Sequence, residues 1–210
     1  MAAKNKLVID LGCGRNKSKD ATIGVDNIKL DTVDVVHDLL DFPYPFTDES
    51  ADEIILSHVL EHFCLSDIIK ILDEAGRILK PQGNITISVP HVFSVGAAMD
   101  PGHKTVFTYE TLYYFTESHL ASYRKDLKTQ CSWAIKRLWT SVSCFNDHFK
   151  EITPLKRKIS SFFTLILNFI LNRSKGKTFP DMVIKFSPFW LVSIHAKIQK
   201  VGCVEKSTGH

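Results

Sequence analysis

Short aliphatic runs, separated by polar and glycine-containing stretches, recur along the chain. Most have an aliphatic centre and end at or near a polar residue. Continuous short apolar runs of this kind are typical of buried parallel strands. The runs that predict strands lie at residues 6–11, 22–26, 33–36, 52–57, 84–89, 132–139 and 190–201.

Two stretches between these runs have the spacing of helices. Apolar residues return at three- and four-residue intervals over 65–79, with Ser66 as the expected N-cap and Pro81 as the stop. A second helix is expected over 108–119, with Thr108 as its cap. Strands that alternate with helices indicate an α/β domain with a mostly parallel sheet.

Composition narrows the class of protein. The 210 residues are 44% hydrophobic and 23% charged, which suits one globular domain with a sizeable core. A net charge of +3 is too small for a general polyanion binder, so nucleic acid is not the expected partner. The five cysteines include no C-x-x-C pair, and no charged-then-apolar leader opens the chain. We therefore expect a reduced, cytoplasmic chain without a disulfide scaffold.

One segment near the C-terminus differs from the rest. Residues 150–177 contain seven Lys or Arg and only Glu151 as an acid, and they enclose the apolar run 162–171. This run is too short to span a bilayer, which takes about 20 residues, but basic flanks suit a helix lying on anionic lipid. Residues 156–177 are therefore a candidate for peripheral membrane contact. A helix pair packed over the sheet edge or a homodimer interface is slightly favoured over that interpretation.

A glycine turn follows the first predicted strand, in Asp10-Leu-Gly12-Cys-Gly14. Glycine lets the backbone approach a ligand closely, and we expect a helix behind the turn to offer free N–H groups. The dinucleotide fingerprint requires a third glycine where Lys17 stands, and an acid about twenty residues on. Instead Asp26 ends the second run soon after the turn, where its carboxylate can accept both hydroxyls of a ribose. The expected ligand is a nucleoside without pyrophosphate.

With these motifs the chain resembles the class I S-adenosylmethionine (SAM) dependent methyltransferases, specifically their small type 11 subgroup. The resemblance covers residues 6 to about 120, although Gln82 stands where the subgroup usually has glycine and no helix precedes the first strand. The matching segments, in the subgroup's order, are residues 8–14, 24–26, 35–39, 45–46, 51–54, 57–62, 74, 77–81 and 87–90.

The resemblance implies a fold and a domain plan. The fold is a single doubly wound Rossmann-like domain, with a mostly parallel sheet and an antiparallel C-terminal strand. It would occupy residues 1–205, with a cofactor-binding core at 6–120, a variable insertion at 140–188 that serves as substrate lid, and a frayed tail at 206–210.

The resemblance also implies SAM as the cofactor, together with its contacts. An acidic cleft suits a sulfonium and an α-ammonium group, and residues 31–61 contain nine acids and no Lys or Arg. The implied contacts are the backbone of Gly12, Cys13, Gly14, Ser57 and His58 for the methionyl part, Asp10 for its amino group, Asp26 for the ribose, and Asp38 and Leu39 for the adenine.

Methyl transfer from a sulfonium is an in-line displacement that needs alignment but no enzyme nucleophile. A hydroxyl acceptor needs a base, for which histidine is suited. We prefer His103, oriented by Asp100, with His91 as a second candidate; a surface turn at Asp100 with no catalytic role for His103 is equally favoured. The expected acceptor is a hydroxyl of a small molecule, a saccharide or a lipid-linked substrate. A catalytically silent SAM-binding partner or membrane tether is the alternative, and a metal-assisted RNA or quinone O-methyltransferase is less favoured.

The stretch His58-x-x-Glu61-His62 invites a metal interpretation. It is similar to a stretch in ubiquinone-pathway and small-RNA O-methyltransferases, where a first-position glutamate helps to bind magnesium together with a later histidine, comparable to His91 or His103. Here the first position is His58, and magnesium prefers oxygen ligands, whereas histidines suit a transition metal. Because Leu-Glu-His is also common in the type 11 subgroup without a metal, we expect none.

Overall fold

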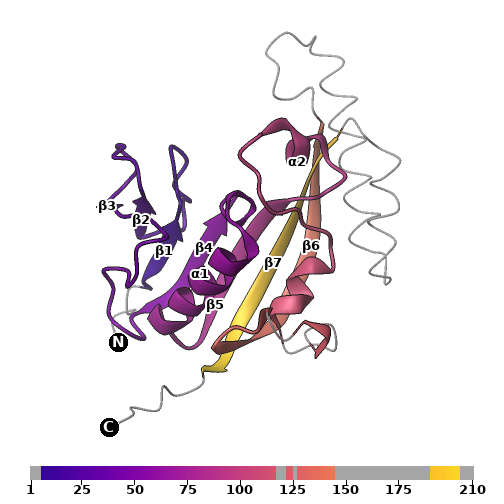
Figure 1. Ribbon diagram of the computed structural model, residues 1–210. Helices are drawn as coiled ribbons and strands as arrows, with labels where there is room; N and C mark the ends of the chain where they lie inside the picture. The colour runs from indigo at the N-terminus through magenta and orange to yellow at the C-terminus, as the bar shows by residue number, and fades with distance from the viewer. Residues whose placement is uncertain (1–5, 117–121, 125–126, 145–189, 204–210) are drawn as a thin grey trace.

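The computed structural model describes residues 6–116, 122–124, 127–144 and 190–203. Its centre is a seven-stranded sheet in the order β3-β2-β1-β4-β5-β7-β6 (Figure 1). The first five strands pair in parallel, and β7 runs antiparallel to both β5 and β6. This confirms the predicted mostly parallel, Rossmann-like sheet with an antiparallel C-terminal strand. The strands are β1 (Val8–Leu11), β2 (Ile23–Asp26), β3 (Val35–Val36), β4 (Ala51–Ser57), β5 (Leu79–Pro90), β6 (Cys131–Cys144) and β7 (Trp190–Cys203).

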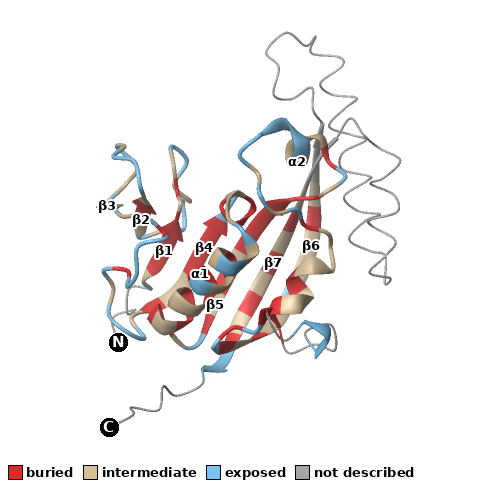
Figure 2. Ribbon diagram, viewed as in Figure 1, coloured by how far each residue is buried: buried red, intermediate tan, exposed pale blue. Residues whose placement is uncertain are grey.

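One face of the sheet is apolar and holds the core. In adjacent strands the register aligns Ile9 with Ile54, Ile54 with Ile85, and Ile85 with Ile198, and all four are buried. Helix α1 (Leu65–Ile78) and the 3₁₀ turn η2 (Thr111–Phe115) add their buried side chains to the same cluster (Figure 2). These apolar rows determine which face of each strand turns inward.

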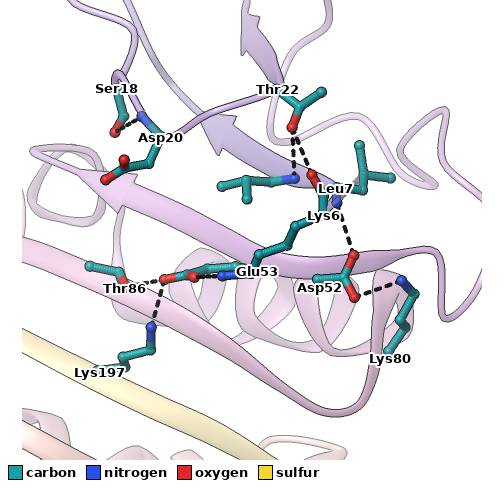
Figure 3. A network of polar contacts seen from close by, with 11 residues as sticks. Lys6, Leu7, Ser18, Asp20, Thr22, Asp52, Glu53, Lys80, Thr86 and Lys197 are labelled. Carbon is teal, nitrogen blue, oxygen red and sulfur yellow. Dashed lines mark hydrogen bonds and ion pairs between the residues drawn. The ribbon is translucent and has the colours of Figure 1, made fainter. Parts of the chain in front are cut away.

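The opposite face is polar and is organised around Glu53. Its carboxylate accepts hydrogen bonds from the Thr86 hydroxyl at 2.8 Å and the Lys197 ammonium at 2.9 Å, and it pairs with Lys6 (Figure 3). Burial alone would raise the pKa of Glu53, but these three donors together outweigh it and hold the pKa at about 2. Hydrogen bonds from Thr86 and Lys197 to Glu53 therefore link β4, β5 and β7 on this face.

A second polar group lies farther along the same face. Because Thr86 pairs with Lys197 and Ser88 with His195, these side chains share one side of the sheet. The His195 Nε2 lies 2.6 Å from the Ser141 hydroxyl, and its ring stacks on Trp139 at 5.3 Å between centroids. Burial, with a smaller contribution from the charge of His58, lowers the pKa of His195 to about 4.

Helix positions differ in part from those predicted. Helix α1 begins at Leu65 with Cys64 as its N-cap, so the assignment of Ser66 as cap is wrong; Leu65 is already helical and Ser66 therefore lies inside the helix. Instead of a helix over 108–119, the described residues form only η2, since Thr116 is already extended.

No helix follows the glycine turn within residues 12–22, contrary to expectation. These residues form turns and irregular backbone, because a connection this short must also return to the start of the parallel strand β2. Two short elements were not predicted: η1 (Leu60–His62) and α2 (Val95–Met99).

The expectation of a chain without disulfides is wrong for one pair. A disulfide joins Cys131 to Cys203, 72 residues apart, because β6 and β7 place them directly opposite one another. Cys13 and Cys64 are free. Burial raises the pKa of the Cys13 thiol to about 11, so it stays protonated at neutral pH.

The basic, apolar segment around residues 150–177 is not among the described residues. The membrane candidate 156–177 lies outside the described residues, as does the expected lid over 140–188 apart from the end of β6. In the described part of the chain, no helix has the length and apolar character needed to cross a membrane.

Gln82 provides a first test of this fold. It has φ +61°, in the left-handed region where a Cβ is unfavourable, at the position where the type 11 subgroup usually has glycine. We expect Gln82→Gly to raise the free energy of unfolding by about 0.5–1 kcal/mol, after the entropic cost of glycine is subtracted. Urea unfolding measures this change. Gln82→Ala, which keeps the Cβ, is the matched control and should change little; an equal gain in both variants would contradict the strain.

His195 provides a pH test. Its pKa of about 4 lies below the ordinary 6.5, so the unfolded chain binds more protons between these values and stability falls as pH falls through this window. We expect wild type to lose about 1–2 kcal/mol more than His195→Gln between pH 7 and pH 4, a figure discounted for partial exposure. Denaturant unfolding at both pH values measures the difference, and parallel curves would show that His195 is not responsible.

Candidate cofactor site and neighbouring histidine cluster

A cavity of about 500 Å³ opens where the chain leaves β1, β2 and β4. Its volume is within the range of roughly 300–1,000 Å³ that small-molecule sites occupy. Ligands of open α/β sheets bind at this edge, beyond the carboxyl ends of the strands. The lining residues are Gly12, Asp26, Asn27, Ile28, Asp38, Leu39, His58, Val59, His62 and Phe63.

The glycine turn forms one wall of the cavity. The N–H groups of Gly12 and Cys13 donate to the Val25 carbonyl at 2.8 and 3.0 Å, which ties the turn to β2. Gly12 has φ +74°, and a Cβ there would lie 2.6 Å from a methyl carbon of Val59. Gly14 also has a positive φ, +50°, but faces open space. Gly12 is therefore required both for its conformation and for the close approach to Val59.

Asp26 is fixed in place by the backbone around it. One carboxylate oxygen accepts the Gly14 N–H at 2.9 Å and the other accepts the Ile28 N–H at 3.1 Å. A carboxylate has about four acceptor positions, so this arrangement leaves two for a ligand. Asp26 therefore combines a fixed orientation with free acceptor capacity in the cavity wall.

Asp38 and Leu39 line the same cavity from the segment after β3. One oxygen of Asp38 accepts the Leu40 N–H at 2.9 Å, while the side chain stays exposed. Leu39 is buried, and its carbonyl accepts the Tyr44 hydroxyl at 2.8 Å. The structure thus brings a carboxylate and an apolar side chain to adjacent parts of the wall.

Asp10 lies beneath the glycine turn and is not among the lining residues. It is 2% exposed, and one oxygen accepts the Ser18 N–H at 2.7 Å. Burial raises its pKa, only partly opposed by that hydrogen bond and by Lys17. Its other oxygen is buried and has no partner within the described structure. Asp10 thus holds the loop in place, and its contact with the cofactor amine stays a prediction.

Several other assignments for the cofactor site differ from the cavity lining. Cys13, Gly14 and Ser57 were predicted as contacts but do not line the cavity, whereas Asn27, Ile28, Val59 and Phe63 do. The position of Asn27 and Ile28 directly after the acid that ends β2 was the available signal. Ile28 is 61% exposed, so its apolar side chain is open to a ligand in this cavity.

The segment after β4 brings His103 to the edge of this cavity. The N–H groups of Lys104 and Thr105 donate to the Glu61 carbonyl at 2.8 and 3.1 Å. These two hydrogen bonds attach the loop residues 103–105 to η1. As a result the rings of His103 and His62 meet edge to face at 4.8 Å, and His62 lines the cavity. Two histidines distant in sequence therefore lie together beside the predicted cofactor site.

The partner of His103 is not the expected one. Its Nδ1 lies 3.0 Å from the Ala97 carbonyl, whereas Asp100 accepts the Gly102 N–H at 2.7 Å within its own turn. The prediction that Asp100 orients His103 is therefore wrong, because the short side chain of Asp100 is used by the turn. His91 is completely buried, and its Nδ1 accepts the Phe93 N–H at 3.1 Å, which indicates a packing role.

Comparison with known proteins agrees with this site. Residues 13–87 match the model of a methyltransferase domain family, type 11. A SAM-dependent methyltransferase from Archaeoglobus fulgidus has the same fold, with a TM-score of 0.52 at 20% identity over 93% of this chain and 86% of that one. Phosphoethanolamine N-methyltransferase 1 of Haemonchus contortus, in complex with phosphoethanolamine and S-adenosylhomocysteine, superposes with a TM-score of 0.50 at 13% identity over 98% of this chain and 41% of that one. No curated protein sequence matches the chain.

The matched segment contains the Gly14, Asp26 and Asp38 positions, and the fold around it is that of SAM-dependent methyltransferases. Residues 13–87 therefore match a type 11 methyltransferase domain, and the chain has the fold of SAM-dependent methyltransferases. These findings agree with the predicted type 11 resemblance and with SAM as the cofactor that this resemblance implies.

The two glycines of the turn offer a matched pair of substitutions. Gly14→Ala should cost about 1–2 kcal/mol of stability through backbone strain alone. Gly12→Ala should cost about 1–3 kcal/mol more, because its Cβ also overlaps Val59. Urea unfolding measures both. Gly12→Ala made in a Val59→Ala background, and compared with Val59→Ala alone, should cost only the strain. Equal costs for the two single glycine variants would refute the close contact.

Proposed function

We propose that the chain methylates a hydroxyl group of a small-molecule, saccharide or lipid-linked acceptor, with His103 as the general base. The observation that carries this proposal is the contact between His103 and His62, which brings a histidine from outside the cofactor motifs to the edge of the cofactor cavity. The match of residues 13–87 to a methyltransferase domain supports methyl transfer itself, and the acceptor and the base are the further parts of the proposal.

In this proposal the cofactor lies along the cavity wall. Asp26 accepts the ribose hydroxyls with its two remaining acceptor positions, and the adenine packs between Ile28 and Leu39 with its amine at Asp38. The methionyl end then reaches Gly12 and His58, near η1. The exposed Ile28 and the fixed carboxylate of Asp26 support this orientation.

The hydrogen bond to Ala97 supports His103 as the base. A carbonyl can only accept, so His103 donates its Nδ1 proton to Ala97, and its Nε2 keeps a free lone pair. That lone pair can take the proton of an acceptor hydroxyl as the methyl group arrives. Because the displacement needs mainly alignment, the remaining residues of the site position the two reactants.

One structure of the same fold supports a small polar acceptor. It is the Haemonchus contortus phosphoethanolamine N-methyltransferase, in complex with phosphoethanolamine. The lid over 140–188 and the membrane or homodimer role of 156–177 stay predictions, since these residues lie outside the described structure. They are the part of the chain from which we expect acceptor selectivity.

Two substitutions separate cofactor binding from catalysis. Asp26→Ala should weaken S-adenosylhomocysteine binding by at least about a hundredfold, since two hydrogen bonds to a charged group are lost at roughly 1.5–3 kcal/mol each. His103→Ala should keep that affinity and lower the rate of methyl transfer by about 10²–10⁴. Calorimetry and transfer of a labelled methyl group measure the two effects.

The acceptor for the rate measurement comes from a screen of labelled methyl transfer to saccharides, small metabolites and lipid extracts. Glu110→Gln, at the N-cap of η2 and outside the lining of the cofactor cavity, is a control that should change neither quantity. Normal turnover by His103→Ala would reject His103 as the base, and unchanged affinity in Asp26→Ala would reject the cofactor orientation. If S-adenosylhomocysteine binds normally and no acceptor is methylated, the silent-binding alternative is favoured instead.

A further inference from the structure

Glu61 is a buried acid that is only half satisfied. It is 1% exposed, and its Oε1 lies 3.2 Å from Nδ1 of His58. Its Oε2 is buried and has no hydrogen-bond partner within the described residues. Among the described residues, His58 is the one side chain that forms an ion pair with Glu61. A buried carboxylate oxygen without a donor is costly, so Glu61 Oε2 has capacity for a further donor or a cation.

Two histidines surround that carboxylate. Donor atoms of Glu61, His62 and His103 all lie within 4.8 Å of one another. The backbone holds the three together, since Glu61 and His62 are neighbours in η1 and the Glu61 carbonyl accepts the N–H groups of Lys104 and Thr105. The cluster is thus attached at fixed points and not formed by long mobile side chains.

The outer contacts also suit metal ligands. Histidine ligands of metals almost always donate their other ring N–H to a carbonyl or carboxylate, and ligating carboxylates are in turn hydrogen-bonded. His103 has such a contact with the Ala97 carbonyl, and Glu61 has one with His58. The sequence argued against a metal because His58 replaces a carboxylate ligand. In the structure His58 contacts the Glu61 carboxylate through its Nδ1 and is not one of the three clustered donor residues.

We propose that Glu61, His62 and His103 bind one divalent transition-metal ion of the zinc type. Two imidazoles and one carboxylate are a donor set suited to zinc, which takes three protein ligands at open sites and leaves a position for another ligand. Zinc bonds of about 2.0–2.1 Å place tetrahedral donors about 3.3–3.5 Å apart, so the side chains close around the ion by small rotations. Because His62 lines the cofactor cavity, the open position lies beside that cavity.

Cobalt titration tests this site directly. Tag-free full-length protein is treated with a chelator, dialysed and titrated with Co²⁺, whose visible absorption reports coordination by protein donors; Zn²⁺ then competes for the site. We expect one equivalent to bind. Glu61→Gln and His103→Ala should each weaken binding by at least about tenfold. His37→Ala, which removes a histidine that contacts the Asp41 carbonyl away from the cluster, should bind as wild type does.

Thermal unfolding adds a readout that a purely structural role would not produce. Zn²⁺ should raise the Tm of wild type by binding the folded state, and should raise that of Glu61→Gln much less. Without metal, Glu61→Gln should be at least as stable as wild type, because the variant no longer buries a charge of which one oxygen has no partner. A metal-free Glu61→Gln variant that is clearly less stable would show that the carboxylate is already satisfied and would overturn the proposal.

Other results would overturn it as well. Absence of saturable binding, or equal affinity in wild type and Glu61→Gln, would show that no site exists at Glu61. Loss of binding in Glu61→Gln with full retention in His103→Ala would show that His103 is not a ligand. The inference does not rest on the proposed reaction. A bound ion occupies the Nε2 of His103 that we propose as base, so the rate comparison for His103 is made on chelator-treated protein, and either proposal can fail without the other.

Discussion

The contact between Gly12 and Val59 connects the two halves of the site. Gly12 directly follows β1 and Val59 lies just after β4, and no side chain fits between the backbone of one and the methyl groups of the other. This approach places the turn that holds Asp26 against the segment that begins at His58. The Glu61 carbonyl then carries the constraint onward to residues 103–105 through two backbone hydrogen bonds. The cofactor cavity and the histidine cluster therefore depend on one close packing of backbone.

The sheet that supports this contact has two chemically different faces. On one face aliphatic side chains from five strands meet α1 and η2 and exclude water. On the other, Glu53 collects donors from β5, β7 and the start of the chain, and its depressed pKa shows that these donors more than compensate for burial. The short connection after β1 carries no helix and contributes a turn to the site instead. The carboxyl ends of the strands thus stay accessible around the glycine turn.

Left-handed backbone and buried carboxylate oxygens without partners occur together at this edge of the sheet. Gly12, Gly14 and His58 all have positive φ there, and Asp10 and Glu61 each keep a buried oxygen without a partner. Backbone in the left-handed region and buried polar atoms without partners persist where the surrounding structure enforces them, and both gather at functional sites. For Glu61 the neighbouring histidines supply a specific reason, since the same cluster that offers a base to an acceptor also has the composition of a metal site.

The sequence alone determined the local chemistry. Aliphatic runs and glycine positions were sufficient for the strands, the turn and the order of motifs, and hence for the resemblance to type 11 methyltransferases, because these depend on neighbouring residues. Asp26, Asp38, Leu39, His58 and Gly12 were recognised in this way, and all line one cavity.

Only the tertiary structure decided which distant groups meet. The β6–β7 register pairs Cys131 with Cys203, the Ala97 carbonyl replaces Asp100 as the partner of His103, and the Glu61 carbonyl brings His103 to His62. Such contacts depend on backbone register and loop paths across the sheet, which no spacing along the chain encodes.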